Sequence, residues 1–376
     1  MKTIVVSAVN LNAGGTLTIL KDCLQYLSLL AEKKGYRIIA LVNKKELAEY
    51  PNIKYLELQW PKKSWIGRLW CEYITMRGIS KSLAPIDLWL SLHDTTPCVY
   101  ADKRAVYCHN PFPFYKWRVR ELLFTPKIVL FAIFSKWIYK ININKNDYII
   151  VQQQWIKNSF LRWFNLRSET VIIAPPPKEF KKNISINFSA NMHVNRSKKE
   201  TPVVFLFPAT ANSHKNFECL CSATEVLYKR LKKGLFEVYI TVKGDENAYG
   251  RWLYHKWGMN PALNFTGFLN KQGLYTLYEQ ADCLVFPSKI ETWGLPITEF
   301  ASYRKPMLLA DLSYAHETAS ECEFVSFFDP NNFIQLADKM EKIIQGNFSE
   351  FEKVDKVYIN TPVVYSWQEL FRLLLS

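Results

Sequence analysis

The sequence predicts an α/β protein built from two Rossmann-like domains. Short runs rich in β-branched and aromatic residues alternate with longer segments of helical periodicity, a pattern typical of βαβ units with parallel strands. The alternation stops near residue 176 and starts again near residue 201. A chain of 376 residues also exceeds the length at which a single hydrophobic core usually stops growing. We therefore expect two domains, each with its own parallel sheet.

The first domain is expected to cover residues 1–175. Its strand candidates are TIVVSAV (3–9), RIIALV (37–42), IKYLEL (53–58), IDLWLSL (86–92), RAVYCH (104–109), DYIIVQ (147–152) and TVIIAP (170–175). Helical periodicity covers residues 16–34, 64–83, 116–140 and 153–164. Because parallel sheets of this kind bind ligands at the carboxyl ends of their strands, the loops after these strands are the places to look for a site.

Residues 176–200 interrupt this pattern. Three prolines are followed by polar and basic residues with little periodicity, which indicates a linker or an exposed loop. The second domain is expected over residues 201–360, with a helix near 216–233 and further helices between the strands. Its strand candidates are VVFLFPAT (203–210), FEVYITVKG (236–244), LNFTGF (263–268), DCLVFPS (282–288), KPMLLAD (305–311) and FVSFFD (324–329). Residues 361–376 contain a short amphipathic helix, SWQELFRLLLS.

The charge is distributed unevenly between the two halves. Residues 1–200 hold 31 Lys and Arg against 14 Asp and Glu, whereas residues 201–376 hold 17 against 20, for a net charge of +14. Such a bias suggests that the first half faces an anionic partner, for example a membrane surface, nucleic acid or a phosphorylated substrate. A simple contribution to solubility is the alternative.

The cysteines and the hydropathy favour a cytoplasmic protein that does not span a membrane. The eight cysteines form no CxxC pair and several lie in apolar runs, which fits reduced, buried thiols better than disulfides or a zinc site. The N-terminus is too short and too quickly polar for a secretory signal. The longest apolar tract, about 127–139, is interrupted by Lys136 and is shorter than the roughly 20 residues that a bilayer span needs.

Three loops of the first domain hold candidate site residues. Gly14 and Gly15 follow the first strand and open a helix, where backbone N–H groups approach a phosphate closely. A plain strand-to-helix turn would look the same. His109 ends a strand and therefore lies on the ligand side of the sheet, and His93 takes a similar position one strand earlier. A structural histidine is the alternative for both.

Residues 111–167 interleave aromatic and basic side chains. Lys and Arg around an apolar face suit contact with anionic lipid head groups, with Trp and Phe entering the boundary. The alternatives are helices that simply cover the sheet, or nucleic-acid binding by stacking and phosphate contacts; we favour the membrane surface and expect no nucleic-acid partner. The candidate contact residues are Lys116, Arg118, Lys136, Trp137, Lys140, Trp155 and Arg162.

The second domain carries the more informative site. Lys215 stands near a helix N-terminus after the first strand, where an ammonium group and backbone donors converge on a phosphate, although a solvated lysine is the alternative. Gly244 ends the next strand. Glu291 precedes a turn that opens a helix, and Glu299 lies about one helical turn inside. These carboxylates suit sugar and ribose hydroxyls, and the N–H groups of the turn suit phosphate or sugar oxygens. An acidic helix start is the alternative. The turn residues are Thr292, Trp293, Gly294 and Leu295.

The frame E-x-x-G-L-P-x-x-E resembles the EX7E motif of retaining glycosyltransferases of family 4, which have the GT-B fold. The likeness extends over nearly the whole chain and includes the Gly-Gly loop, YCHNPFPFY, VQQQW, HKN and FTGF in order. It implies two Rossmann-like domains facing each other across a cleft, with the C-terminal helix crossing back to the first domain. It also implies that surface-polysaccharide assembly, such as that of lipopolysaccharide or capsule, is the context.

The resemblance also implies roles for the candidate residues. Gly14 and Gly15 would lie beside the diphosphate and the acceptor, and His109 would contact the transferred sugar. Lys215 would neutralise the leaving diphosphate, Glu291 would bind sugar hydroxyls and Glu299 the ribose. Many members place an arginine before the lysine, but here Ala209 stands about there. No D-x-D triplet occurs, which agrees with the metal independence that the resemblance implies.

The function expected from the sequence is therefore transfer of a sugar, with retention, from a nucleotide-diphosphate donor to a growing glycan. No cofactor and no metal are expected. The acceptor is expected to be lipid-linked at the inner face of the cytoplasmic membrane, because of the basic aromatic region. A sugar-nucleotide epimerase of similar fold and a non-catalytic glycan- or nucleotide-binding protein are the alternatives. The base, the sugar, the linkage and the oligomeric state are left open.

Overall fold

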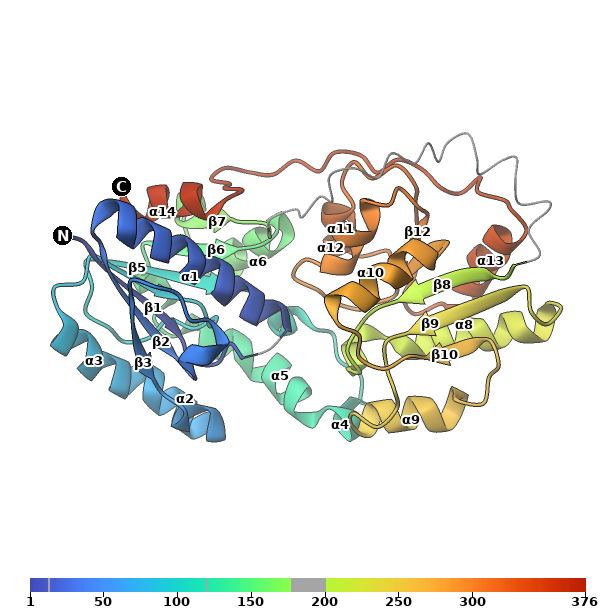
Figure 1. Cartoon of the computed structure of the whole chain (residues 1–376), viewed down its shortest axis with the longest axis horizontal. Helices are drawn as coiled ribbons and strands as arrows, with labels where there is room; N and C mark the ends of the chain where they lie inside the picture. The colour runs from blue at the N-terminus through green and yellow to red at the C-terminus, as the bar shows by residue number, and fades with distance from the viewer. Residues whose placement is uncertain (13, 120, 177–200) are drawn as a thin grey trace. The chain divides into compact units, whose positions relative to one another are not determined.

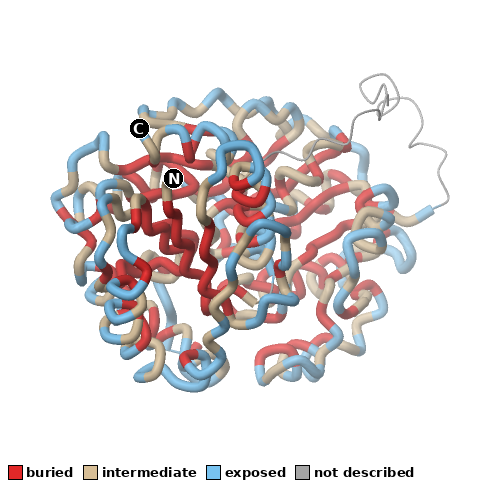
Figure 2. Tube along the Cα trace, turned by 60° about the vertical axis from the view of Figure 1, so that its left-hand side comes forward, coloured by how far each residue is buried: buried red, intermediate tan, exposed pale blue. Residues whose placement is uncertain are grey.

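The computed structural model describes residues 1–12, 14–119, 121–176 and 201–376. Within these residues the chain forms two parallel sheets with helices on both faces, which confirms the predicted α/β class (Figure 1). The central strands of both sheets are buried, and Figure 2 shows the buried parts of the chain in red. The linker expected over residues 176–200 lies, except for its first residue, outside the described residues.

The first sheet has seven strands in the described part of the chain, in the order β3-β2-β1-β4-β5-β6-β7. The strands are β1 (Thr3–Ala8), β2 (Arg37–Val42), β3 (Ile53–Glu57), β4 (Leu88–Ser91), β5 (Lys103–Cys108), β6 (Tyr148–Val151) and β7 (Val171–Ile173). The helices are α1 (Gly14–Lys34), α2 (Trp65–Trp70), α3 (Met76–Leu83), α4 (Glu121–Phe124), α5 (Pro126–Lys140) and α6 (Gln154–Phe164). Every strand candidate of the first half is confirmed, and most of the observed strands are shorter than the candidates by one or more residues at their ends.

The second sheet has six strands among the described residues, in the order β10-β9-β8-β11-β12-β13. The strands are β8 (Val203–Phe207), β9 (Phe236–Ile240), β10 (Leu263–Phe265), β11 (Cys283–Phe286), β12 (Met307–Ala310) and β13 (Val325–Phe328). The helices are α8 (Phe217–Arg230), α9 (Ala248–Trp257), α10 (Lys271–Gln280), α11 (Leu295–Ala301), α12 (Ser313–Thr318) and α13 (Phe333–Ile344). In both sheets the strand order reverses beside the first strand, at β1–β4 and at β8–β11, where open α/β sheets place their ligands.

Two predicted helices differ from the observed ones for local reasons. The helix expected over residues 64–83 is interrupted by a π-turn, Cys71–Thr75, which adds a residue to one turn and separates α2 from α3. The helix expected over residues 116–140 starts only at Glu121 and restarts at Pro126. Proline has no N–H to donate to the preceding turn, so it favours the first position of a new helix.

The two faces of the first sheet bury different helices. One face packs Leu20, Leu24 and Leu27 of α1, and the other packs Cys71 and Met76 of the α2–α3 segment. Helix α14 (Trp367–Leu375) belongs to the α1 side, where its Phe371 ring stacks on Tyr26 at 5.5 Å. Just before it, Val363 pairs with Ile173 and adds the chain to the sheet edge.

The chain divides into two compact units by its internal contacts. The first unit comprises Met1–Asn110, Phe134–Pro177 and Ile359–Ser376, and the second comprises Pro111–Ile133 and Lys178–Tyr358. The sequence assigned residues 111–133 to the first domain. Instead they pack with the second unit, through contacts that a sequence pattern does not reveal.

Candidate functional site

The second unit concentrates its predicted residues at the switch point of its sheet. Strands β8 and β11 are hydrogen-bonded neighbours, with Leu206 paired to Leu284. The loop after β8 contains Lys215, and the loop after β11 contains Glu291. The two loops therefore emerge side by side from the carboxyl ends of adjacent strands, although Lys215 and Glu291 are 76 positions apart in the chain.

Lys215 and Glu291 form an ion pair in which Lys215 Nζ donates to Glu291 Oε1 at 2.5 Å. Both side chains are partly buried, with 17% and 12% of their surface exposed. Asn216, in a left-handed conformation with φ of 61°, holds the lysine loop in place by donating from Nδ2 to the carbonyl groups of Pro287 and Pro330. The structure thus brings together two residues that the sequence proposed separately.

The turn after Glu291 has a conformation that requires glycine at one position. Gly294 has φ of +86°, and a Cβ placed there would lie 3.2 Å from Ile297 Cδ1. Trp293 is buried and its indole N–H donates to Thr298 Oγ1 at 2.8 Å, whereas Thr292 and Leu295 are more accessible. The turn is therefore fixed by packing, and helix α11 starts from it as the sequence predicted.

Glu299 lies on α11 and accepts a hydrogen bond at Oε2 from the Tyr278 hydroxyl, at 2.8 Å. Burial raises the pKa of Tyr278 well above its ordinary value, and the Glu299 carboxylate raises it further. Tyr278 is therefore a permanent donor at neutral pH, and it orients the second carboxylate of the motif. No sequence pattern indicated this tyrosine, because it lies on α10 and reaches Glu299 of α11 only in the folded chain.

Gly244 has a φ of +103° and lies in the loop after β9. Strand β9 is the neighbour of β8, the strand that precedes the lysine loop. A Cβ at this position would lie 2.5 Å from Tyr254 Cβ. This close approach accounts for glycine here without a ligand, so a donor contact of Gly244 stays a prediction.

The lysine loop is braced by the segment Pro111–Ile133 of the same unit. Lys289 Nζ lies 3.2 Å from Glu121 and 3.3 Å from Glu218 and is largely buried between them. Thr125 hydrogen-bonds Ser213 at 2.8 Å, directly beside His214 and Lys215. Burial lowers the pKa of His214 well below its ordinary value, and Lys215 and Lys289 lower it further, so its imidazole is neutral at pH 7.

In the first unit, His109 follows β5 and is held by Asp94 from the loop after β4. Asp94 Oδ1 accepts the backbone N–H groups of His109 and Asn110 at 2.8 and 3.0 Å, and Oδ2 lies 3.8 Å from His109 Nε2. Burial lowers the pKa of His109; Asp94 acts in the opposite direction, and His93 and Arg68 add to the lowering. The His109 imidazole is therefore neutral at pH 7. Asp94 fixes the position of His109 through the hydrogen bonds to the backbone.

A largely buried cluster of Arg68, Glu72, His93 and Thr95 lies close enough to influence the pKa of His109. The sequence did not predict this cluster. Arg68 Nε donates to Glu72 Oε1 at 3.0 Å, His93 Nδ1 lies 3.3 Å from the same oxygen, and Thr95 donates to Glu72 Oε2 at 2.5 Å. Burial by itself would raise the pKa of Glu72, but His93, Arg68 and Thr95 outweigh it and lower this pKa to about 2. His93 is thus part of a structural network, and the π-turn carries the carboxylate that anchors it.

The remaining predicted residues of the first half are spread over both units. Gly14 and Gly15 are exposed at the start of α1, where Gly14 has φ of +61°; residue 13 of their loop lies outside the described residues. Of the residues proposed for acceptor or membrane contact, Trp155 is half-buried and the others are exposed. The exposed ones are Lys116, Arg118, Lys136, Trp137, Lys140 and Arg162.

Comparison with known proteins assigns the second unit to a family. Residues 189–361 match the model of glycosyl transferases group 1. The second unit carries a group 1 glycosyltransferase domain. An uncharacterized glycosyltransferase of Methanocaldococcus jannaschii is 29% identical over 199 residues, which are 52% of this chain and 49% of that protein. The match therefore spans about half the length of this relative.

Solved structures share the fold of the whole chain. Sucrose-phosphate synthase from Thermosynechococcus elongatus aligns with a TM-score of 0.64 and 14% identity, over 92% of this chain and 90% of that one. WaaG, a glycosyltransferase involved in lipopolysaccharide biosynthesis, aligns with a TM-score of 0.59 and 13% identity, over 91% and 92%. At these identities the likeness shows the GT-B fold, which confirms the fold class predicted from the sequence.

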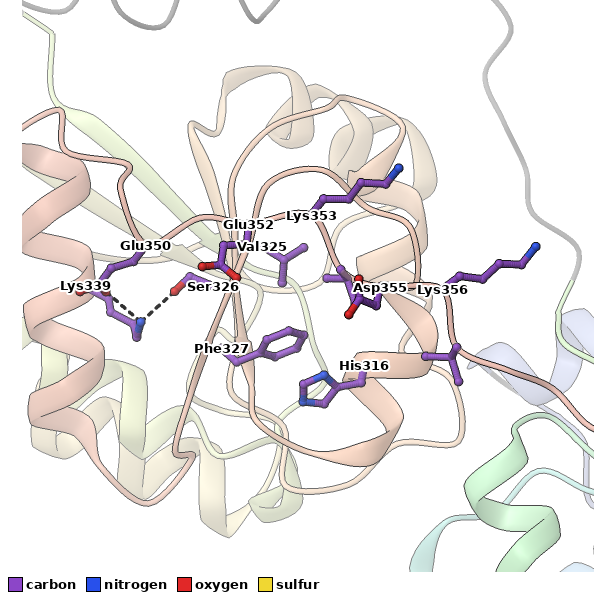
Figure 3. A pocket seen from close by; sticks show the side chains of 12 residues that line it. His316, Val325, Ser326, Phe327, Lys339, Glu350, Glu352, Lys353, Asp355 and Lys356 are labelled. Carbon is purple, nitrogen blue, oxygen red and sulfur yellow. Dashed lines mark hydrogen bonds and ion pairs between the residues drawn. The ribbon is translucent and has the colours of Figure 1, made fainter.

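Two other features of the glycosyltransferase domain concern Ala209 of the lysine loop and a pocket beside β13. Ala209 donates its N–H to Thr241 Oγ1 at 2.8 Å, so it serves the loop through its backbone. A pocket of about 470 Å³ lies beside β13, where His316 stacks on Phe327 and Lys339 bonds to both Ser326 and Glu350 (Figure 3). None of the predicted donor residues lines it.

The described residues contain neither a membrane-spanning helix nor a cluster of metal-ligating side chains. In that part of the chain, no helix is both long enough and apolar enough to cross a bilayer. Nor do any three His, Cys, Asp or Glu side chains of the described residues come together as a metal site. The expected metal independence stays a prediction.

Proposed function

We propose that the chain is a retaining, metal-independent glycosyltransferase that moves a sugar from a nucleotide-diphosphate donor to a growing glycan. The observation that carries this proposal is the ion pair between Lys215 and Glu291, located at the switch point of a group 1 glycosyltransferase domain. A donor can replace both contacts of this pair. Its phosphate can bind the lysine, and its sugar hydroxyls can donate hydrogen bonds to the glutamate.

In this proposal the donor replaces the internal ion pair. Lys215 neutralises the negative charge that develops on the leaving diphosphate, which is the part that a metal ion plays in other enzymes. Glu291 turns to the sugar hydroxyls. Glu299, already oriented by Tyr278, accepts the two ribose hydroxyls, and the backbone from Thr292 to Leu295 borders the same space.

The first unit is proposed to supply the acceptor side. His109 is neutral and rigidly held, so it can contact the transferred sugar without adding a positive charge near the reacting carbon. The acceptor oxygen forms the new bond to the anomeric carbon while the bond to the diphosphate breaks, and the acceptor proton passes to an oxygen of the leaving phosphate. Gly14 and Gly15 leave room for phosphate and acceptor.

A lipid-linked glycan at the inner face of the cytoplasmic membrane is the proposed acceptor, in the assembly of a surface polysaccharide. Its support is the exposure of basic and aromatic side chains that suit an anionic lipid surface. Trp137 is 67% exposed, and Lys136 and Lys140 flank it on the same helix. The indole and the two ammonium groups suit the boundary between head groups and acyl chains.

The test measures release of nucleotide diphosphate after a panel of nucleotide sugars has been screened by thermal shift for a stabilising donor. Lys215→Ala should reduce turnover by roughly 10²-fold or more with little change in fold. The matched control is Lys339→Ala, because the Lys339 side chain is 14% exposed and also ion-paired, but lies apart from the donor residues. Equal turnover in wild type and Lys215→Ala would reject the role of the lysine.

The same assay distinguishes the proposed transferase from the two alternatives, an epimerase and a non-catalytic binding protein. A sugar-nucleotide epimerase would convert the donor without any acceptor, whereas the proposed transferase needs a glycan for turnover. A binding protein would be stabilised by a nucleotide sugar and would convert none of the panel. Retention is read from the anomeric configuration of the product by NMR.

A further inference from the structure

The α2–α3 segment of the first unit has apolar side chains on two opposite faces. Cys71 and Met76 are buried in the core of the first sheet. On the outer face, Ile66 is 79% exposed, Trp70 59% and Ile74 53%. A helix that only covers a sheet needs one apolar stripe, and the outer one gains nothing from folding. Such an apolar patch on an outer surface is typical of an interaction site.

The π-turn keeps this outer stripe in line. Ile66, Trp70 and Ile74 follow one another at intervals of four residues, and four residues exceed one α-helical turn of 3.6 residues. A π-turn contains more residues than an α-turn, so the turn from Cys71 to Thr75 rotates Ile74 back toward the line of Ile66. Trp65, 46% exposed, widens the stripe at its first turn.

The charges around the stripe are of one sign. Residues 60–83 contain a single acidic residue, Glu72, and this carboxylate is buried and bonded to Arg68 and Thr95. Exposed cations lie at both ends of the stripe: Lys62 and Lys63 before it, and Arg77 and Lys81 after it.

A second helix presents the same combination next to the first. On α5 and just beyond it, Phe134, Trp137 and Ile141 are 55%, 67% and 43% exposed. Residues 126–145 contain no Asp or Glu. Tyr139, on the buried side of α5, is close enough for its hydroxyl and the Arg68 guanidinium of α2 to influence each other's charge. Figure 1 also draws α5 on the same side of the first sheet as α2 and α3.

We infer that the outer face of α2 and its π-turn, with residues 134–141 beside it, docks on an anionic lipid bilayer. Trp and Ile side chains enter the boundary of the acyl chains, while the lysines and Arg77 reach the phosphates at its rim. A protein partner would need acidic residues arranged to match this rim, whereas an anionic bilayer presents phosphates over its whole surface. This inference rests on the proposed function only for the presence of a membrane, and it adds a helix that the sequence did not implicate.

The experiment is co-sedimentation of the full-length chain with vesicles of phosphatidylglycerol and phosphatidylcholine, and with vesicles of phosphatidylcholine alone. Ile66→Ser combined with Trp70→Ser should weaken binding to the anionic vesicles by about tenfold or more, because both side chains lose their burial in the boundary. Lys62→Glu combined with Lys63→Glu should have an effect of similar size that decreases with added salt. Leu29→Ser is the control, because Leu29 is 48% exposed on α1, which packs on the opposite face of the sheet.

Three results would overturn the inference. They are absence of wild-type binding to the anionic vesicles, equal binding by the Ile66/Trp70 variant, and a wild-type dimer that this variant converts to a monomer. The last result would identify the face as a contact between two copies. Thermal shift with UDP and GDP on the same variants keeps the proposed function separate. Nucleotide binding that survives in all variants while vesicle binding is lost supports the docking face, and nucleotide binding that is absent from every variant and from wild type counts against the donor site alone.

Discussion

Lys215 Nζ lies 2.5 Å from Glu291 Oε1 and joins the loops that follow two adjacent strands of the second sheet. In the absence of a donor, each charge is neutralised by the other. Removal of one partner leaves a partly buried charge without its counterion, and the cost of this exceeds the value of the pair itself. Donor binding therefore has to compensate both groups at once, with a phosphate and with hydroxyls.

This relationship predicts a coupling energy between the two residues. In a double-mutant cycle with Lys215→Met and Glu291→Gln, urea unfolding should give a coupling of roughly 1–3 kcal/mol. The control cycle uses Lys339 and Glu350, whose carboxylate is 36% exposed, and should give about 0.2–1 kcal/mol. Additive effects of the two substitutions at Lys215 and Glu291 would show that the contact contributes nothing to stability.

The second carboxylate of the motif depends on Tyr278. Tyr278→Phe removes the hydroxyl that donates to Glu299 and should weaken binding of UDP or GDP by about three- to tenfold, since a hydrogen bond to a charged group is involved. The value of kcat should change little. Isothermal titration with the two nucleotides measures the effect. Tyr303→Phe is a suitable control, because Tyr303 is also a buried tyrosine beside α11; an equal loss in both variants would indicate a packing effect instead.

Features that depend on neighbouring residues in the chain could be predicted from the sequence, whereas features that depend on contacts between distant residues could not. Strand positions and the loops at Lys215 and Glu291 were predictable, because hydrophobic alternation and turn residues are local properties. The π-turn that carries Glu72 left no such mark, since one extra residue in a helical turn barely changes the periodicity. The attachment of residues 111–133 to the second unit uses contacts between residues far apart in the chain, such as Lys289 with Glu121, 168 positions away. Periodicity indicates which face of a helix is apolar, but not which surface covers it.

The neutral His214 predicts a pH dependence of stability. Its pKa in the folded state is lowered from an ordinary value of 6.5, first by burial and then by Lys215 and Lys289. The unfolded chain therefore binds more protons below that pH, and the free energy of unfolding should fall as the pH drops from about 7 to about 5. His214→Gln should flatten this slope by up to about 2 kcal/mol over the interval. Urea unfolding across this range measures it, and parallel slopes for the two proteins would contradict the assignment.

Two substitutions of Asp94 can distinguish its effect on the charge state of His109 from its effect on the position of His109. Asp94→Asn keeps an oxygen that can accept the N–H groups of His109 and Asn110, and asparagine tolerates the φ of 70° at this position. It removes the negative charge that raises the pKa of His109, so this already lowered pKa should fall further and the acid limb of the turnover profile should move to lower pH. Asp94→Ala also removes the acceptor and should reduce kcat/KM by roughly 10²-fold, because the histidine loop loses its anchor. If the asparagine and alanine variants had the same activity and the same pH profile as wild type, His109 would not depend on Asp94 for its place or its charge state.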